Sequence, residues 1–155
     1  MDRVIDGRCQ CGRIRYRVEG EPLGLVVCHC IECQRQSGSA FGMSLAVASS
    51  AFKLYSGALK TFEVKCDSGR IKTCAFCPEC GTRIYHQTGN GMSIKAGTLD
   101  DTSWLKPIAH YWTKRKQPWV SIPDGVRQFS DDGRSGRGAG RQRPGLPERS
   151  FIVSS

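Results

Sequence analysis

The chain has 155 residues, of which 39% are hydrophobic and nine are cysteine, and its formal net charge is +9. This length allows one domain with one modest core. The first residues lack the apolar region of a secretory signal, and no run approaches the roughly 20 apolar residues of a membrane span. We therefore expect a cytoplasmic protein with reduced cysteines, rather than a membrane protein or a disulfide scaffold. The positive charge favours an anionic small molecule or weak contact with a polyanion over a neutral partner.

Short runs of β-prone residues separated by turns fill most of the chain. Residues 13–18 alternate arginine with apolar side chains, which is typical of a strand with one buried face. Further strands are expected at Leu23–Val27, Phe41–Val47, Phe52–Ser56, Leu59–Cys66, Arg70–Phe76, Arg83–Thr88, Met92–Thr98 and Ile108–Lys114. Asp67-Ser68-Gly69 predicts a hairpin, and Glu32–Ser37 predicts one or two helical turns. Many short strands with little helix predict an all-β domain over residues 1–130.

The composition changes at about residue 131, where apolar residues become rare and arginine alternates with glycine. We expect residues 131–155 to form a disordered tail, because such a segment cannot bury enough apolar surface to fold. A solvated tail and a tail that touches nucleic acid both remain open.

Two cysteine pairs far apart in the sequence predict a first metal site. Cys9 and Cys11 form a C-x-C turn, and Cys77 and Cys80 form a C-x-x-C knuckle. Two such pairs are the usual ligands of a closed tetrahedral zinc. We expect this zinc to be structural and to tie the start of the domain to its middle.

Three further cysteines, Cys28, Cys30 and Cys33, lie within six residues and predict a second zinc site. Two interpretations stay open. The site is either catalytic, with one open coordination position, or structural, completed by a histidine, Cys66 or Cys74. His29 is a poor ligand here, since neighbours on an extended turn point apart, and we consider it a catalytic proton carrier. Cys66 and Cys74 are otherwise expected to be free thiols.

Three groups of residues together resemble a known family. They are Gly7-x-Cys9-x-Cys11-Gly12, then Cys28-His29-Cys30-x-x-Cys33-x-x-x-Ser37-Gly38, then Phe76-Cys77-x-x-Cys80-Gly81-Thr82. Ala96-Gly97-Thr98-Leu99-Asp100-Asp101 and Pro107-x-x-His110-x-Trp112-Thr113 extend the likeness. The chain resembles the glutathione-dependent formaldehyde-activating enzyme (GFA) family, which also contains centromere protein V, from about residue 6 to 129.

The resemblance implies a β-tent fold of several short, coiled, antiparallel sheets organised by two zinc ions. It implies a structural zinc on the first four cysteines and a catalytic zinc on Cys28, Cys30 and Cys33. It also implies a carbon–sulfur lyase that acts on thiol adducts, with glutathione or another thiol as co-substrate and S-(hydroxymethyl)glutathione as a candidate product.

Arg35 and the cluster Lys114–Lys116 are candidate anchors for the carboxylates of such a thiol, with Trp112 or Trp119 as an apolar wall. Two other functions remain open. One is a non-catalytic two-zinc module that binds protein or nucleic acid through its basic surface, and the other is redox sensing by Cys66 or Cys74.

Overall fold

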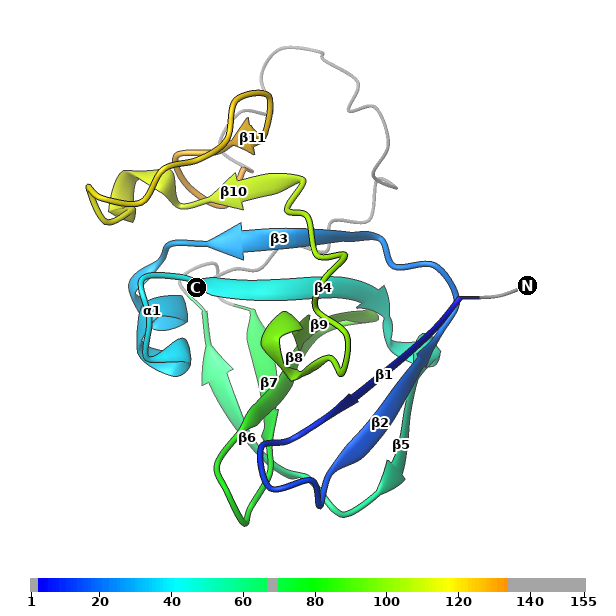
Figure 1. Cartoon of the computed structure of the whole chain (residues 1–155). Helices are drawn as coiled ribbons and strands as arrows, with labels where there is room; N and C mark the ends of the chain where they lie inside the picture. Colours follow the sequence, from blue (N-terminus) through cyan, green and yellow to red (C-terminus); the bar gives the residue numbers. More distant parts are fainter. Residues whose placement is uncertain (1–2, 67–69, 134–155) are drawn as a thin grey trace.

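The structure is a computed structural model that describes residues 3–66 and 70–133, and strands make up most of it (Figure 1). The strands are β1 (Val4–Arg8), β2 (Arg15–Glu19), β3 (Gly24–Cys28), β4 (Gly42–Ala48), β5 (Phe52–Ser56), β6 (Lys60–Lys65), β7 (Ile71–Phe76), β8 (Arg83–Thr88), β9 (Gly91–Lys95), β10 (Ala109–Tyr111) and β11 (Arg127–Gln128). The helical elements are α1 (Ile31–Ser37) and the 3-10 turns η1 (Ser49–Ala51), η2 (Ala96–Thr98) and η3 (Thr113–Arg115).

The strands form two sheets. The smaller sheet has the order β1-β2-β5, and the larger has the order β11-β10-β3-β4-β9-β8-β7-β6. In Figure 1 the smaller sheet packs at an angle beside the larger one. The helix α1 lies where β3 ends and β4 begins. The expected all-β fold of β-tent type is confirmed. The pairing of β10 with β3 and β11 is parallel, which differs from the antiparallel arrangement that we expected throughout.

The main hydrophobic core lies between the two sheets. The smaller sheet contributes Ile5, Tyr16 and Val18, and the larger one contributes residues such as Leu45 and Ile94. Alternation along each strand explains this, since β2 buries Tyr16 and Val18 and exposes the arginines between and before them. The sheets therefore meet through one apolar face each.

The other face of the larger sheet carries a second, smaller cluster. Val26 and Cys28 of β3 pack there with Ala109 and Tyr111 of β10, together with Cys30 and Cys33 from α1 and the turn before it. Ser44, Ser93, Lys95, His86 and Lys72 are also buried, although they are polar or charged. Buried polar and charged side chains often gather at functional sites, so this face is a candidate functional site.

Two short strands were not expected from the sequence, β1 and β11. The hairpin turn predicted at Asp67–Gly69 and the tail from residue 134 onward lie outside the described residues. The strands on either side of that turn, β6 and β7, do pair antiparallel. In the part of the chain that the structure describes, no helix has the length and apolar character needed to cross a membrane.

Candidate metal centres and the pocket between them

The first cysteine cluster joins the ends of two distant strands. Cys9 and Cys11 follow β1, Cys77 and Cys80 follow β7, and their four sulfur atoms lie within 4.8 Å of one another. Cys9 Sγ lies 3.4 Å from Cys11 Sγ, which lies 3.8 Å from Cys77 Sγ. Sulfurs around a tetrahedral zinc ion, at about 2.3 Å each, would lie about 3.8 Å apart. The four sulfurs therefore fit one metal ion, as the sequence predicted.

The backbone around this cluster is arranged alike in both cysteine turns. Gly12 and Gly81 each follow a cysteine pair with φ of 77° and 76°, a conformation that glycine adopts at little cost. Gly12 N–H donates to the Cys9 carbonyl at 3.0 Å, and Gly81 N–H donates to the Cys77 carbonyl at 2.9 Å. These turns bend the chain so that both sulfurs of each pair face the same point.

Hydrogen-bond donors surround the sulfurs of the first cluster. Ile14 N–H donates to Cys9 Sγ at 3.2 Å, and the Thr82 hydroxyl lies 3.1 Å from Cys80 Sγ. The Thr82 hydroxyl bond, supported by backbone donors, lowers the pKa of Cys80 to about 5. A thiolate is the form that binds a metal, so the donors favour the ligating state.

The second cluster contains three sulfurs, those of Cys28, Cys30 and Cys33, within 4.8 Å of one another. Cys28 ends β3, Cys30 caps α1, and Cys33 lies in the first turn of that helix. All three side chains are buried. Within the described ranges, no histidine, carboxylate or further cysteine supplies a fourth ligand atom to this group. Of the two interpretations left open by the sequence, the geometry favours an incomplete ligand set.

The charges around the second cluster also fit a metal–thiolate site. Hydrogen bonds from the Cys28 and Cys33 thiols hold the pKa of Cys30 at about 3. Lys72 exerts a favourable charge on Cys30, and Lys95 does so on Cys33. Both lysines are buried, with 7% and 9% of their surface exposed. Because three thiolates around a divalent cation carry one net negative charge, nearby buried cations compensate it.

His29 points away from the three sulfurs and towards β10. Its side chain is fully buried, and its Nε2 lies 2.9 Å from Nδ1 of His110 in a hydrogen bond between stacked rings. Burial lowers the pKa of His29 to about 4, and the positive charges of His110 and Lys116 act in the same direction. His29 is therefore an uncharged ring at neutral pH, and it does not complete the second cluster.

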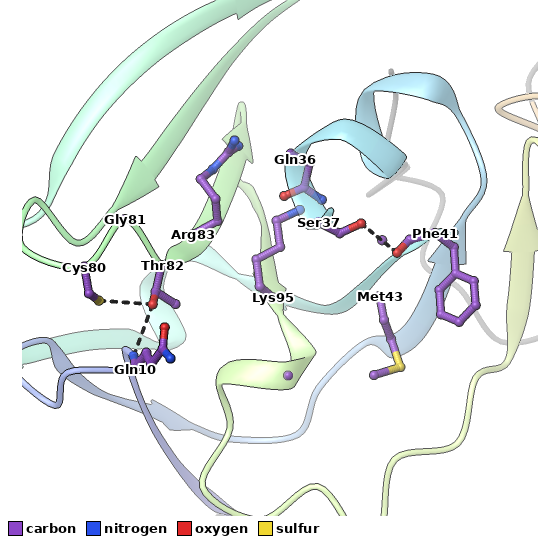
Figure 2. Close-up of a pocket in the computed structure, with 12 residues that line it drawn as sticks. Gln10, Gln36, Ser37, Phe41, Met43, Cys80, Gly81, Thr82, Arg83 and Lys95 are labelled. Carbon is purple, nitrogen blue, oxygen red and sulfur yellow. Dashed lines mark hydrogen bonds between the residues drawn. The ribbon is translucent and has the colours of Figure 1, made fainter. Parts of the chain in front are cut away.

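A pocket of about 470 Å³ is lined by Cys80 of the first cluster and by Gly42, which lies against Cys33 of the second cluster, whereas Cys28, Cys30 and Cys33 do not line it (Figure 2). Its wall combines Gln10, Cys80, Gly81 and Thr82, next to the first cluster, with Gln36, Ser37, Phe41 and Gly42, next to the second. Met43, Arg83, Lys95 and Gly97 complete the lining. A methyl group built on Gly42 would lie 3.5 Å from Cys33 Sγ, which shows how near this wall is to the three sulfurs. The volume suits a small-molecule ligand.

The cations of this pocket differ from those proposed from the sequence. Arg35 is exposed and pairs with Glu32 at 2.9 Å, and Lys114 lies over the Trp112 ring. Neither these residues nor Trp119 lines the pocket. Lys95 and Arg83 do line it, whereas the sequence predicts only that they lie within strands.

A β-bulge explains why Arg83 was missed. Ala75 pairs with Tyr85, but the next residue of β7, Phe76, pairs with Arg83, which leaves Ile84 without a partner. A bulge of this kind reverses the alternation of side chains along a strand. Arg83 consequently shares a face with Phe76 and Cys74 rather than with the apolar core, and only the register reveals it.

Cys66 and Cys74 belong to neither cluster. Their side chains are 4% and 1% exposed, so neither offers the accessible thiol that redox sensing requires. The prediction that they are not metal ligands agrees with this placement, and the redox hypothesis loses its support.

Comparisons with known proteins agree with the sequence and the fold. A model of the family described as glutathione-dependent formaldehyde-activating enzyme matches residues 4–115. A crystal structure of a Rhodobacter sphaeroides protein has the same fold, with a TM-score of 0.51 and 19% identity. That match covers 80% of this chain and 98% of the other. None of the curated proteins matches.

Proposed function

The chain belongs to the glutathione-dependent formaldehyde-activating enzyme family, and from this premise we propose that it is a zinc-dependent carbon–sulfur lyase that acts on thiol adducts. The candidate reaction joins glutathione and formaldehyde to give S-(hydroxymethyl)glutathione. The proposal includes two zinc ions, a structural one on Cys9, Cys11, Cys77 and Cys80 and a catalytic one on Cys28, Cys30 and Cys33.

One observation supports this function more than any other. The second cluster has three converging sulfurs and no fourth ligand atom among the described residues, and Gly42, which lines a pocket of about 470 Å³, lies against Cys33. A metal site with three protein ligands and an adjacent pocket is typical of catalytic zinc, whereas structural zinc is enclosed by four.

The reaction forms one carbon–sulfur bond and needs no oxidant or reductant. When bound, zinc lowers the pKa of a substrate thiol and so supplies a thiolate nucleophile at neutral pH. As the sulfur bonds to the aldehyde carbon, the carbonyl electron pair moves to oxygen, which takes up the proton that the thiol has lost. The reverse sequence cleaves the adduct. Cys28, Cys30 and Cys33 would hold the ion, and Gln36, Phe41 and Met43 would line the space beside it.

We keep His29 as the proposed proton carrier of this reaction. Its Nε2 bonds to His110, and its Nδ1 has no hydrogen-bond partner among the described residues. Its pKa of about 4 keeps the ring neutral at pH 7, and the ring contacts Phe41, which lines the pocket. His29→Gln should slow turnover while the metal content stays unchanged.

The experiment combines metal analysis with a screen of thiol adducts. We expect two equivalents of zinc per chain and turnover of S-(hydroxymethyl)glutathione, followed by nuclear magnetic resonance. Cys30→Ser should retain the fold, lose one equivalent and lose at least ~100-fold in turnover, because a metal-assisted step contributes several kcal/mol. Turnover that survives this substitution would exclude the second cluster as the catalytic site.

Cys74→Ala is the matched control, since it removes a buried thiol that belongs to neither cluster. It should keep both zinc ions and full turnover. The alternative function, a non-catalytic two-zinc module, instead predicts nucleic-acid binding that weakens with salt and survives Cys30→Ser.

A further inference from the structure

The pocket has a cationic wall, and one of its two cations, Lys95, also lies near Cys33 of the second cluster. Arg83 and Lys95 line the pocket, and among the described residues no aspartate or glutamate does. The ion pairs found in the described residues, Arg8–Asp100, Arg17–Asp6 and Arg35–Glu32, include neither cation. The two positive charges of the pocket therefore face a space without a protein carboxylate.

Polar atoms of the same wall lack partners. Arg83 Nε and Gln36 Nε2 are buried atoms with no hydrogen-bond partner among the described residues, and both belong to side chains that line the pocket. Figure 2 shows the Lys95 side chain extending from β9 toward the carboxamide of Gln36. Buried donors are nearly always satisfied in folded proteins, so donors left open at a pocket indicate a ligand that accepts from them.

The donors are held in place before any ligand arrives. The Arg83 guanidinium lies over the Phe62 ring, with 5.0 Å between its Cζ and the ring centroid. Lys95 Nζ lies 3.0 Å from Nδ1 of His86, another buried side chain. Groups that are already fixed lose little conformational freedom on binding an anion.

We infer that Arg83, Lys95 and Gln36 bind a carboxylate of the substrate, so that the site selects anionic thiols over neutral ones. This inference rests on the proposed function for the identity of the ligand as a thiol. A carboxylate accepts the donors of a guanidinium, an ammonium and a carboxamide, and it neutralises the wall. Gly42 lies against both Gln36 and Cys33, so the wall that would hold the carboxylate is close to the cluster that would hold the sulfur.

The test measures binding rather than turnover, with zinc-loaded full-length protein and two probes. Calorimetry gives the Kd of glutathione and of glutathione diethyl ester, which keeps the thiol and lacks both carboxylates. We expect the ester to bind roughly 10- to 100-fold more weakly, the range for a lost charge-assisted hydrogen bond. The preference for glutathione should shrink as salt is added.

Arg83→Gln removes one charge from a partly exposed side chain and should lower the preference for glutathione about tenfold or more, with ester affinity and zinc content unchanged. Lys95→Met should act in the same direction. Arg35→Gln is the control, because Arg35 is an exposed arginine paired with Glu32 outside the pocket. Circular dichroism and zinc content verify that each variant is folded. If Lys95→Met does not fold, Arg83→Gln alone decides.

Equal affinity of the wild type for both probes, or no measurable binding of glutathione, overturns the inference. So does a preference that persists in Arg83→Gln. The two proposals fail separately. Turnover of both thiols at equal rates leaves the lyase standing without the carboxylate site, whereas selective binding of glutathione without turnover of any adduct leaves the carboxylate site without the lyase.

Discussion

The two cysteine clusters differ in the number of their sulfurs, in their exposure and in their location. The first has four sulfurs, includes an exposed cysteine, Cys11, and lies where the ends of β1 and β7 meet. The second has three sulfurs, all buried, at the end of β3 and the start of α1. Four cysteines from two distant segments would tie these segments together through one metal ion. Three cysteines from a single segment would not join distant parts of the chain.

The surroundings of the clusters differ in the same sense. Cys9 and Cys77 belong to the main hydrophobic core, so the first cluster is continuous with the packing between the sheets. The second cluster lies on the other face of the larger sheet, among buried lysines and histidines. We propose that sulfur number and location together separate a stabilising cluster from a reactive one, and this proposal can be tested.

The largest difference should appear in stability. Cys77→Ser removes a fully buried ligand of the first cluster that does not line the pocket. It should lower the free energy of unfolding by more than about 3 kcal/mol, because a metal link between distant segments contributes directly to folding. Cys30→Ser should cost much less and leave a cooperative transition.

Thermal and urea unfolding of the zinc-loaded proteins measure this contrast. If both variants lose the same stability, the second cluster is structural too and the distinction between the clusters fails. A wild-type stability that chelation does not change would show that neither cluster binds a metal that matters for folding.

Most strands could be predicted from the sequence because they are short runs of β-prone residues bounded by turn residues. The predicted bounds of β5 and β8 agree with the structure. β1 was missed because Gly7 suggested a turn. In the structure a methyl group at Gly7 would overlap the Tyr16 side chain, so this strand position has to be glycine. The parallel pairing of β10 with β3 depends on long-range contacts that local patterns do not contain.

An intermediate effect is expected at the wall between the pocket and the second cluster. A Cβ at Gly42 would lie 2.9 Å from Gln36 Nε2 and 3.2 Å from Cys33 Cβ. Gly42→Ala should therefore displace Gln36 and lower glutathione affinity about tenfold, with a stability loss of roughly 1–2 kcal/mol.

Gly97→Ala is the matched control, because Gly97 also lines the pocket but a Cβ there meets nothing within 4 Å. It should change neither the Kd measured by calorimetry nor the unfolding midpoint. Equal effects of the two substitutions would mean that the pocket wall responds to any added methyl group, and that Gly42 has no special relation to the second cluster.

The cysteine clusters were predictable because short spacing brings sulfurs together within each segment, and two such pairs in one chain are typical of a shared metal site; the structure groups them as expected. The pocket was not predictable. Arg83 reaches it through a bulge, and Lys95 is one residue of a strand that carries no charge pattern. The sequence instead favours the charge cluster Lys114–Lys116 as an anchor. This cluster does not line the pocket, and two of its three residues are exposed. Sequence spacing thus located the two cysteine clusters, and strand register located the cations of the pocket.

The smallest effect should be a pH dependence of stability. It should arise on the face of the larger sheet that carries the second cluster. Burial lowers the pKa of His86 well below 6.5, and the charges of Lys95, Lys72 and Arg83 act in the same direction. An unfolded chain therefore binds a proton at His86 that the folded chain does not, so stability is present above pH 6.5 and is lost as the pH falls below it.

His86→Gln keeps an acceptor for Lys95 Nζ and removes the titration. Urea unfolding is measured between about pH 7.5 and about pH 5, on both sides of the ordinary histidine pKa of about 6.5. The free energy of unfolding should fall less steeply with decreasing pH in the variant, by at most about 1.4 kcal/mol per pH unit. Zinc content measured at each pH separates this effect from metal release. Parallel curves for wild type and variant would mean that His86 takes up no extra proton on unfolding and that the acid sensitivity of the fold arises at the cysteine clusters themselves.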